Sequence, residues 1–172
     1  MDTNATSVST ITIGDVFQEA IANELKVRDL YLQYSHLFDF NHFASDFWKD
    51  LAADENKHAH ELKEAYNLLT PEQKDQSPEK VVQDGMYKVR QQITTIFLRP
   101  VNNLFDAYHI AHELEAGELN YIFKIMISSS ESSVMKIQDI IDGIDKHQNK
   151  LADFRSKFHD RQAMEIIEAN GF

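Results

Sequence analysis

The sequence predicts an all-α fold, and three observations carry that prediction. Only 5 Gly and 3 Pro occur among the 172 residues, turn-forming clusters are few, and 42% of the residues are hydrophobic. The apolar residues recur at steps of three and four, which places them on one face of a helix. A chain of this length suits one domain. We therefore expect residues 13–172 to form one helical domain, preceded by a Ser- and Thr-rich tail, residues 1–12, that is poorly ordered.

The first helix is predicted to begin between Thr12 and Asp15, where small polar residues can cap it, and to end near Phe38. Its inward face is formed by Phe17, Ile21, Glu24, Val27, Tyr31, Tyr34 and Phe38. Glu24 interrupts this apolar and aromatic stripe. Because an isolated buried carboxylate is costly, Glu24 needs a cation, a hydrogen-bonded partner or a raised pKa.

The second helix is predicted from Asn41 to about Leu69, before Thr70 and Pro71. Its inward face is formed by Phe47, Leu51, Glu55, His58, Leu62, Ala65 and Leu69. Glu55 and His58 are the polar residues of this face. Their i and i+3 spacing stacks the two side chains, so that both can reach the same ion.

Residues 71–99 are interpreted as a long, partly helical crossover. A third helix is predicted from Pro100 to about Ile127, with Leu104, Tyr108, Ala111, Glu115, Glu118, Ile122 and Met126 facing inward. A fourth helix, capped by Ser132 or Ser133, is predicted with Val134, Ile137, Ile141, Ile144, His147, Leu151 and Phe154 facing inward. A helical extension is expected to follow near the end of the chain.

Composition excludes several classes of function. The 28 acidic and 17 basic residues give a net charge of −11, which argues against a nucleic-acid or anionic-membrane partner. The absence of cysteine excludes disulfides, thiolate metal sites, iron–sulfur clusters and thiol nucleophiles. No apolar run approaches a membrane span and the start does not resemble a signal peptide, so a cytoplasmic location is expected.

Each of the four predicted inward faces carries a Glu or a His near its middle. Carboxylate and imidazole together form a ligand set that suits iron, manganese or zinc. Glu-x-x-His alone is a weak signal, and its placement on an apolar face is what strengthens it. The pattern therefore predicts a metal site inside the bundle, with satisfied buried polar groups and no metal as the alternative.

Four segments carry a resemblance to a known family: NELKVRDLY, FWKDLAADENKHAHEL, IAHELEAGELNY and IIDGIDKHQNKL. With them the chain resembles the ferritin-like superfamily, and most closely the rubrerythrin-like proteins without a rubredoxin domain. The resemblance implies a ferritin-like four-helix bundle with a long crossover between helices 2 and 3, and a non-haem di-iron centre. The implied metal ligands are Glu24, Glu55, His58, Glu115 and His147, with Glu118 as an extra ligand.

The chain departs from the family pattern at Ile144, where a bridging carboxylate would stand three residues before His147. Glu118 could compensate from the neighbouring helix. Asp142 and Asp145 could do so only with a helix irregularity, because their spacing from His147 points them elsewhere. The expectation is two iron ions if the loss is compensated and one if it is not, with manganese or zinc as alternative metals.

The resemblance also implies a function, namely reduction of peroxide or dioxygen coupled to iron oxidation, as in a rubrerythrin-type peroxidase or ferroxidase. An external electron donor and a homodimer are expected with it. Two alternatives stay open, and neither is an enzyme: a metal-binding or iron-handling bundle without catalysis, and a metal-free structural or interaction bundle. Four tyrosines lie on the inward faces: Tyr31, Tyr34, Tyr108 and Tyr121. They could orient metal ligands, pass oxidising equivalents, or simply pack in the hydrophobic core. His112, one turn before Glu115, is a candidate partner or replacement ligand.

Overall fold

The computed structural model describes residues 11–116 and 149–157. The labelled helices are α1 (Ile13–Leu37), α2 (His42–Leu68), α3 (Pro71–Lys74), α4 (Lys80–Phe97) and α5 (Leu104–Glu115). A further helix spans residues 149–157. These two ranges contain helices and no strand, which confirms the all-α prediction. No helix within them combines the length and the apolarity that a bilayer span requires.

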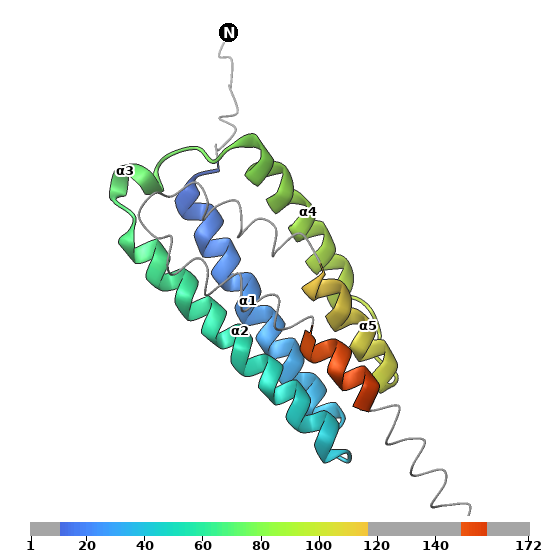
Figure 1. Ribbon diagram of the computed structural model, residues 1–172. Coiled ribbons are helices and arrows are strands. Elements are labelled where there is room, and N and C mark those ends of the chain that lie inside the picture. The colour runs from blue at the N-terminus through green and yellow to red at the C-terminus, as the bar shows by residue number, and fades with distance from the viewer. Residues whose placement is uncertain (1–10, 117–148, 158–172) are drawn as a thin grey trace, which may run out of the picture.

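Helices α1 and α2 form an antiparallel hairpin whose ends lie where the sequence predicted them (Figure 1). Thr12 caps α1, with its hydroxyl accepting from the Asp15 amide at 3.1 Å and the Asp15 carboxylate accepting from the Thr12 amide at 2.9 Å. Asn41 caps α2 by accepting from the Ala44 amide at 3.1 Å. These caps satisfy amides that have no partner within the helix, and they fix where each stripe begins.

An aromatic cluster packs α1 against α2. Trp48 is fully buried, and its ring lies 5.7 Å from the ring of Tyr31, 5.1 Å from that of Tyr34 and 5.0 Å from that of Phe47. Side chains of this size remove a large apolar area from water and have few rotamers. The cluster therefore fixes how α1 and α2 pack against each other.

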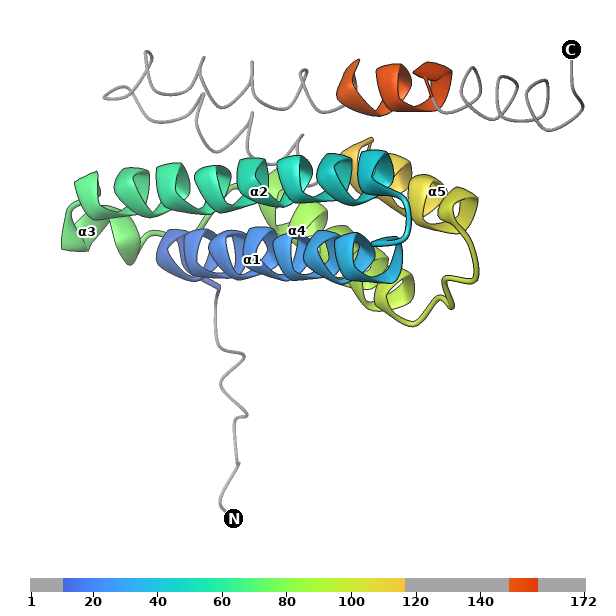
Figure 2. The ribbon, with the colours of Figure 1, turned by 90° about the horizontal axis from the view of Figure 1, so that it is seen from below.

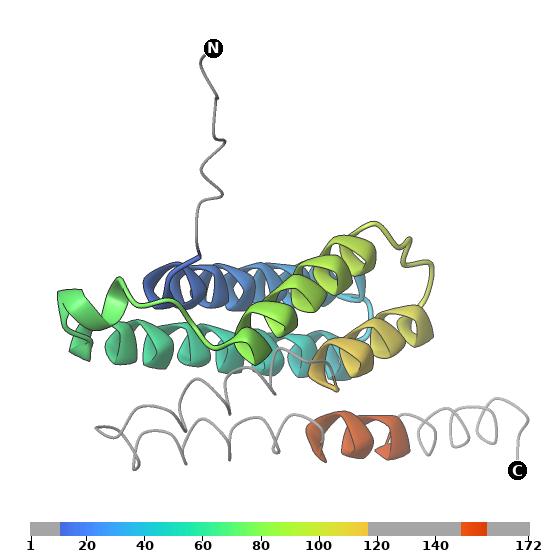
Figure 3. The same ribbon diagram turned by 90° about the horizontal axis from the view of Figure 1, so that it is seen from above.

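The predicted crossover is partly helical, as expected, but α4 also contributes a face to the core. Its buried residues are Val82, Gly85, Met86, Val89, Ile93 and Ile96. Their spacing of three and four residues places them along one side of α4. Beside this face, Arg90 donates two hydrogen bonds to Glu19 of α1, one of them 2.5 Å from Nε to Oε1. Figure 3 shows α4 lying across the hairpin.

Helix α5 begins at Leu104, so the prediction that it begins at Pro100 was wrong. Asn103 provides the cap, since its side-chain oxygen accepts from the Asp106 amide at 2.9 Å. A helix that began at Pro100 would have Arg99 as its cap, and the Arg99 side chain has no oxygen to accept from a first-turn amide, whereas Asn103 has one. Residues 100–103 therefore form a loop. The stretch from residue 117 to 127, predicted as the rest of this helix, lies outside the described residues.

The helix at residues 149–157 packs against α2. Leu151 and Phe154, both predicted to face inward, are buried there. The Phe154 ring stacks on the Phe47 ring, with 3.9 Å between ring centroids, and Lys150 forms an ion pair with Asp54 of α2. Figure 2 shows this segment running alongside α2. The remainder of the predicted fourth helix lies outside the described residues.

Removing the Phe154 ring tests this docking. We expect Phe154→Ala to lower the free energy of unfolding by about 3 kcal/mol, because a buried aromatic ring and its stacking on α2 are lost together. The exposed neighbour Arg155 supplies the control, and Arg155→Ala is expected to change stability by less than about 0.5 kcal/mol. Urea unfolding measures both, and equal stabilities for the two variants would contradict the docking.

Candidate metal centre

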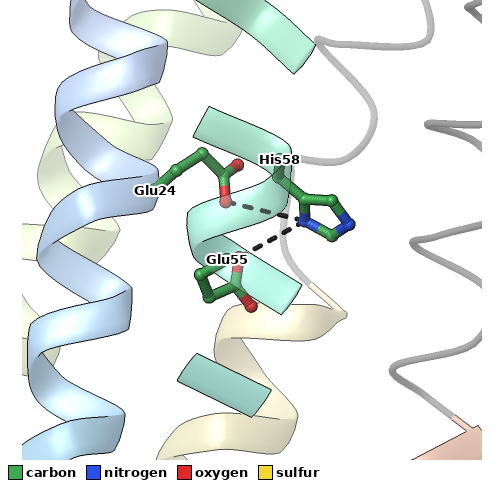
Figure 4. A group of neighbouring side chains, drawn as sticks. All are labelled: Glu24, Glu55 and His58. Carbon is green, nitrogen blue, oxygen red and sulfur yellow. Dashed lines mark ion pairs between the residues drawn. The ribbon is translucent and has the colours of Figure 1, made fainter. Parts of the chain in front are cut away.

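Helices α1 and α2 bring Glu24, Glu55 and His58 together inside the bundle (Figure 4). Glu24 projects from α1, and Glu55 and His58 project from successive turns of α2. Each can offer one ligand atom such that the three atoms lie within 4.8 Å of one another. The relative exposures are only 3% for Glu24, 3% for Glu55 and 8% for His58. The three residues therefore form a buried cluster of carboxylate and imidazole groups.

The distances within the cluster are close to those around a bound ion. His58 Nδ1 lies 3.8 Å from Glu24 Oε2 and 3.4 Å from Glu55 Oε2. Ligand atoms about 2.1 Å from a shared ion in tetrahedral or octahedral geometry stand roughly 3.0–3.4 Å apart. Small side-chain movements would therefore bring the three groups around one ion.

The pKa values of Glu24 and His58 differ strongly from those of the same groups in water. Loss of solvation, together with the negative charge of Glu55, raises the pKa of Glu24 from 4.5 to about 8. Burial by itself would lower the pKa of His58, but hydrogen bonding to Glu24 and Glu55 outweighs it and raises that pKa from 6.5 to about 10. In the metal-free protein, protons on Glu24 and His58 therefore supply the compensation that a cation would otherwise provide.

Glu115 of α5 adds a third helix to the site. Its side chain is buried, and it lines the same small cavity as Glu24, Glu55 and His58. The Tyr31 hydroxyl donates a hydrogen bond to Glu115 Oε1 at 2.8 Å. This hydrogen bond fixes the orientation of the buried Glu115 carboxylate. Groups that hydrogen-bond to metal ligands usually act in this way.

The cavity has a volume of about 20 Å³ and is lined by Glu24, Val27, Glu55, His58, Gln92, Ile93, Leu114 and Glu115. Such a volume holds about one water-sized sphere. Four of the lining residues carry a carboxylate or an imidazole, so the space is both polar and small. Its size and lining suit one ion.

The structure thus brings four of the six predicted ligands around one cavity: Glu24, Glu55, His58 and Glu115. Glu118 and His147 lie outside the described residues, as does Ile144, so the predicted compensation for the missing carboxylate stays a prediction. His112 is exposed on α5. The Tyr31 hydroxyl donates to Glu115, which is the kind of contact that one of the three interpretations of the inward tyrosines predicted.

Sequence reasoning missed Gln92, which reaches the cavity from α4. The signal was present in the apolar spacing of α4, which indicates a helix that must cover part of the core. That spacing does not reveal which residue beside the stripe reaches the site. Comparison with protein-family models, characterised proteins and solved structures found no significant match to this chain.

Two tyrosines of α1 provide a matched test of the contact with Glu115. Tyr31→Phe removes the hydrogen bond to a buried carboxylate, and we expect it to cost about 1–3 kcal/mol of stability. The Tyr34 hydroxyl is buried without a hydrogen-bond partner within the described part of the chain. We therefore expect Tyr34→Phe to be neutral or stabilising. Chemical unfolding of both variants measures the difference, and equal losses would contradict the assigned role of Tyr31.

The pKa shifts of Glu24 and His58 predict how the metal-free protein responds to pH. Both groups hold a proton in the folded protein at pH values where the unfolded chain has released it, Glu24 above 4.5 and His58 above 6.5. Because the folded state binds the extra proton and the unfolded chain does not, the free energy of unfolding falls as pH rises. The fall ends near pH 8 for Glu24 and near pH 10 for His58, the pKa values of the two groups in the folded protein.

We therefore expect the free energy of unfolding of chelator-treated protein to fall between about pH 5 and about pH 9, with a smaller slope in Glu24→Gln, which cannot titrate. Thermal or urea unfolding across this range measures the trend. A stability that rises over the whole range in the metal-free protein would refute the assignment.

Proposed function

We propose that this protein is a non-haem iron protein of the ferritin-like, rubrerythrin type, in which oxidation of bound ferrous iron is coupled to reduction of peroxide or dioxygen. The observation that carries the proposal is the buried group of Glu24, Glu55 and His58, extended by Glu115 from a third helix. The similarity of the four sequence segments to that family supports iron and its oxidation chemistry, and the donor set alone would also accept manganese or zinc.

The donor set fits a divalent ion by charge as well as by geometry. The carboxylates of Glu24 and Glu55, with the neutral imidazole of His58, carry a charge of −2. A divalent cation balances that charge without protonation of Glu24 and without the second ring proton of His58. Leaving these carboxylates buried without such compensation is costly. The raised pKa of Glu24 reflects that cost directly, and the raised pKa of His58 reflects its hydrogen bonding to Glu24 and Glu55. Iron, manganese and zinc all accept this mixture of oxygen and nitrogen ligands.

Each residue of the site has a defined part in the proposed chemistry. Glu24, Glu55 and His58 hold the ion, and Glu115, oriented by Tyr31, supplies a further carboxylate at the cavity wall. Val27, Ile93 and Leu114 give that wall its apolar part and limit access of bulk water. Iron held there would donate electrons to peroxide or dioxygen. An external electron donor would then return the site to its ferrous state.

One observation favours a second candidate function, iron handling without catalysis. A cavity of about 20 Å³ leaves room for one ion or one water, and little for a bound oxidant beside the ion. Catalysis would require the cavity to widen when the oxidant binds, whereas holding iron would not. The two functions therefore differ in how rapidly bound ferrous iron reacts with peroxide.

The experiment begins with anaerobic ferrous loading, desalting and elemental analysis. We expect at least one iron per chain in the wild type and a loss of most of it in Glu55→Ala and His58→Ala. The control is His60→Ala, which removes an exposed histidine from the same helix and should leave iron content unchanged. Iron content that is equal in all four proteins would overturn the proposed site.

Loaded protein is then mixed with hydrogen peroxide in a stopped-flow instrument. Two ferrous ions supply the two electrons that reduce one peroxide to water, so we expect rapid oxidation with about two irons consumed per peroxide. Slow oxidation that increases linearly with peroxide and shows no saturation would instead favour iron handling without catalysis.

A further inference from the structure

Gln92 differs from every other residue that lines the cavity. Seven of the eight lining residues are buried, whereas Gln92 is only partly buried. Gln92 and its buried neighbour Ile93 come from α4, which supplies none of the acidic and histidine groups of the cavity. Among the described residues that line the cavity, Gln92 is therefore the one that is also partly exposed to solvent. The position of this residue suggests a role in access rather than in binding.

Within the described part of the chain, one hydrogen bond holds the Gln92 side chain. Its Nε2 donates to the backbone carbonyl of Glu113 at 2.9 Å. Glu113 lies in the last turn of α5, where carbonyl groups lack partners within the helix and accept from other groups. The Glu113 side chain is itself fixed by Arg99, whose two nitrogens bond its carboxylate at 2.5 and 2.9 Å. The acceptor is thus anchored, and the glutamine side chain is the part that can move.

Within the described residues, three side chains form the apolar part of the cavity wall. Val27, Ile93 and Leu114 are buried and form that part of the wall. A divalent cation carries tightly bound water, and crossing such a wall would strip it without replacement. The amide of Gln92, in contrast, can exchange its bond to the Glu113 carbonyl for bonds to the water around an ion. Rotamer changes of partly exposed side chains are also fast.

From these observations we propose that Gln92 is the gate through which a divalent cation reaches and leaves the cluster of Glu24, Glu55 and His58, and that the Glu113 carbonyl is its latch. This inference rests on the proposed metal binding. The gate opens when one neutral hydrogen bond breaks and the side chain swings toward solvent. Because the gate changes the path and not the bound state, it sets the rates of uptake and release while leaving the affinity almost unchanged.

The test uses Co²⁺ as the probe, since its visible spectrum reports coordination without redox chemistry. Stopped-flow mixing of the metal-free full-length chain with Co²⁺ gives the uptake rate, and mixing of loaded protein with a chelator gives the release rate. We expect Gln92→Ala to raise both rates by about fivefold, the factor that corresponds to losing one neutral hydrogen bond of ordinary strength. The dissociation constant should change by less than about twofold.

Two further variants sharpen the result. Gln91→Ala alters the exposed neighbour of Gln92 on α4 and should change neither rate. Gln92→Met keeps most of the side-chain volume but cannot donate to the Glu113 carbonyl, so a rise in both rates is again expected, smaller than with alanine.

Each other outcome overturns a distinct statement. If wild-type protein binds Co²⁺ but Gln92→Ala leaves both rates unchanged, the gate is wrong and the metal site stands. If Gln92→Ala weakens binding and raises release alone, Gln92 holds the bound state and is not a gate. If wild-type protein binds no Co²⁺, the proposed metal binding fails and the gate fails with it.

Discussion

The burial of Glu24, Glu55 and His58 between α1 and α2 is the constraint on which the rest of the structure depends. Removing two carboxylates and an imidazole from water is favourable only if the groups compensate one another or share a cation. That compensation requires α1 and α2 to be fixed in both rotation and height, because the atoms must meet within a few ångströms. The aromatic packing of Trp48 against both helices supplies the required rigidity.

The surroundings of the site combine a cost and a benefit. The indole nitrogen of Trp48 and the hydroxyl of Tyr34 are buried without hydrogen-bond partners within the described residues, which lowers stability. The same dry surroundings strengthen every electrostatic interaction in the cluster and exclude competing water. The buried surroundings therefore lower the stability of the fold, and they also provide a low-dielectric environment in which a small number of ligands can hold an ion strongly.

Sequence reasoning predicted the parts of the site that follow from helical period. Polar interruptions in apolar stripes identified Glu24, Glu55, His58 and Glu115, because the period determines which face of a helix a residue occupies. The period says nothing about which helices become neighbours or at what height. The hydrogen bond of Tyr31 to Glu115 and the approach of Gln92 depend on those relations, and so does the contribution of α4 to the core. They required the tertiary structure.

One turn of α2 serves two purposes at once. Asp54 points toward Lys150 of the docked helix at residues 149–157, and its neighbour Glu55 points toward the ligand cluster. Successive residues of an α-helix are rotated by about 100° around its axis. A single-residue insertion or deletion just before this turn would rotate both side chains away from their partners, and no side-chain flexibility would restore both. Length changes in α2 should therefore be restricted to its two ends, whereas substitutions on its solvent face should be tolerated along the whole helix.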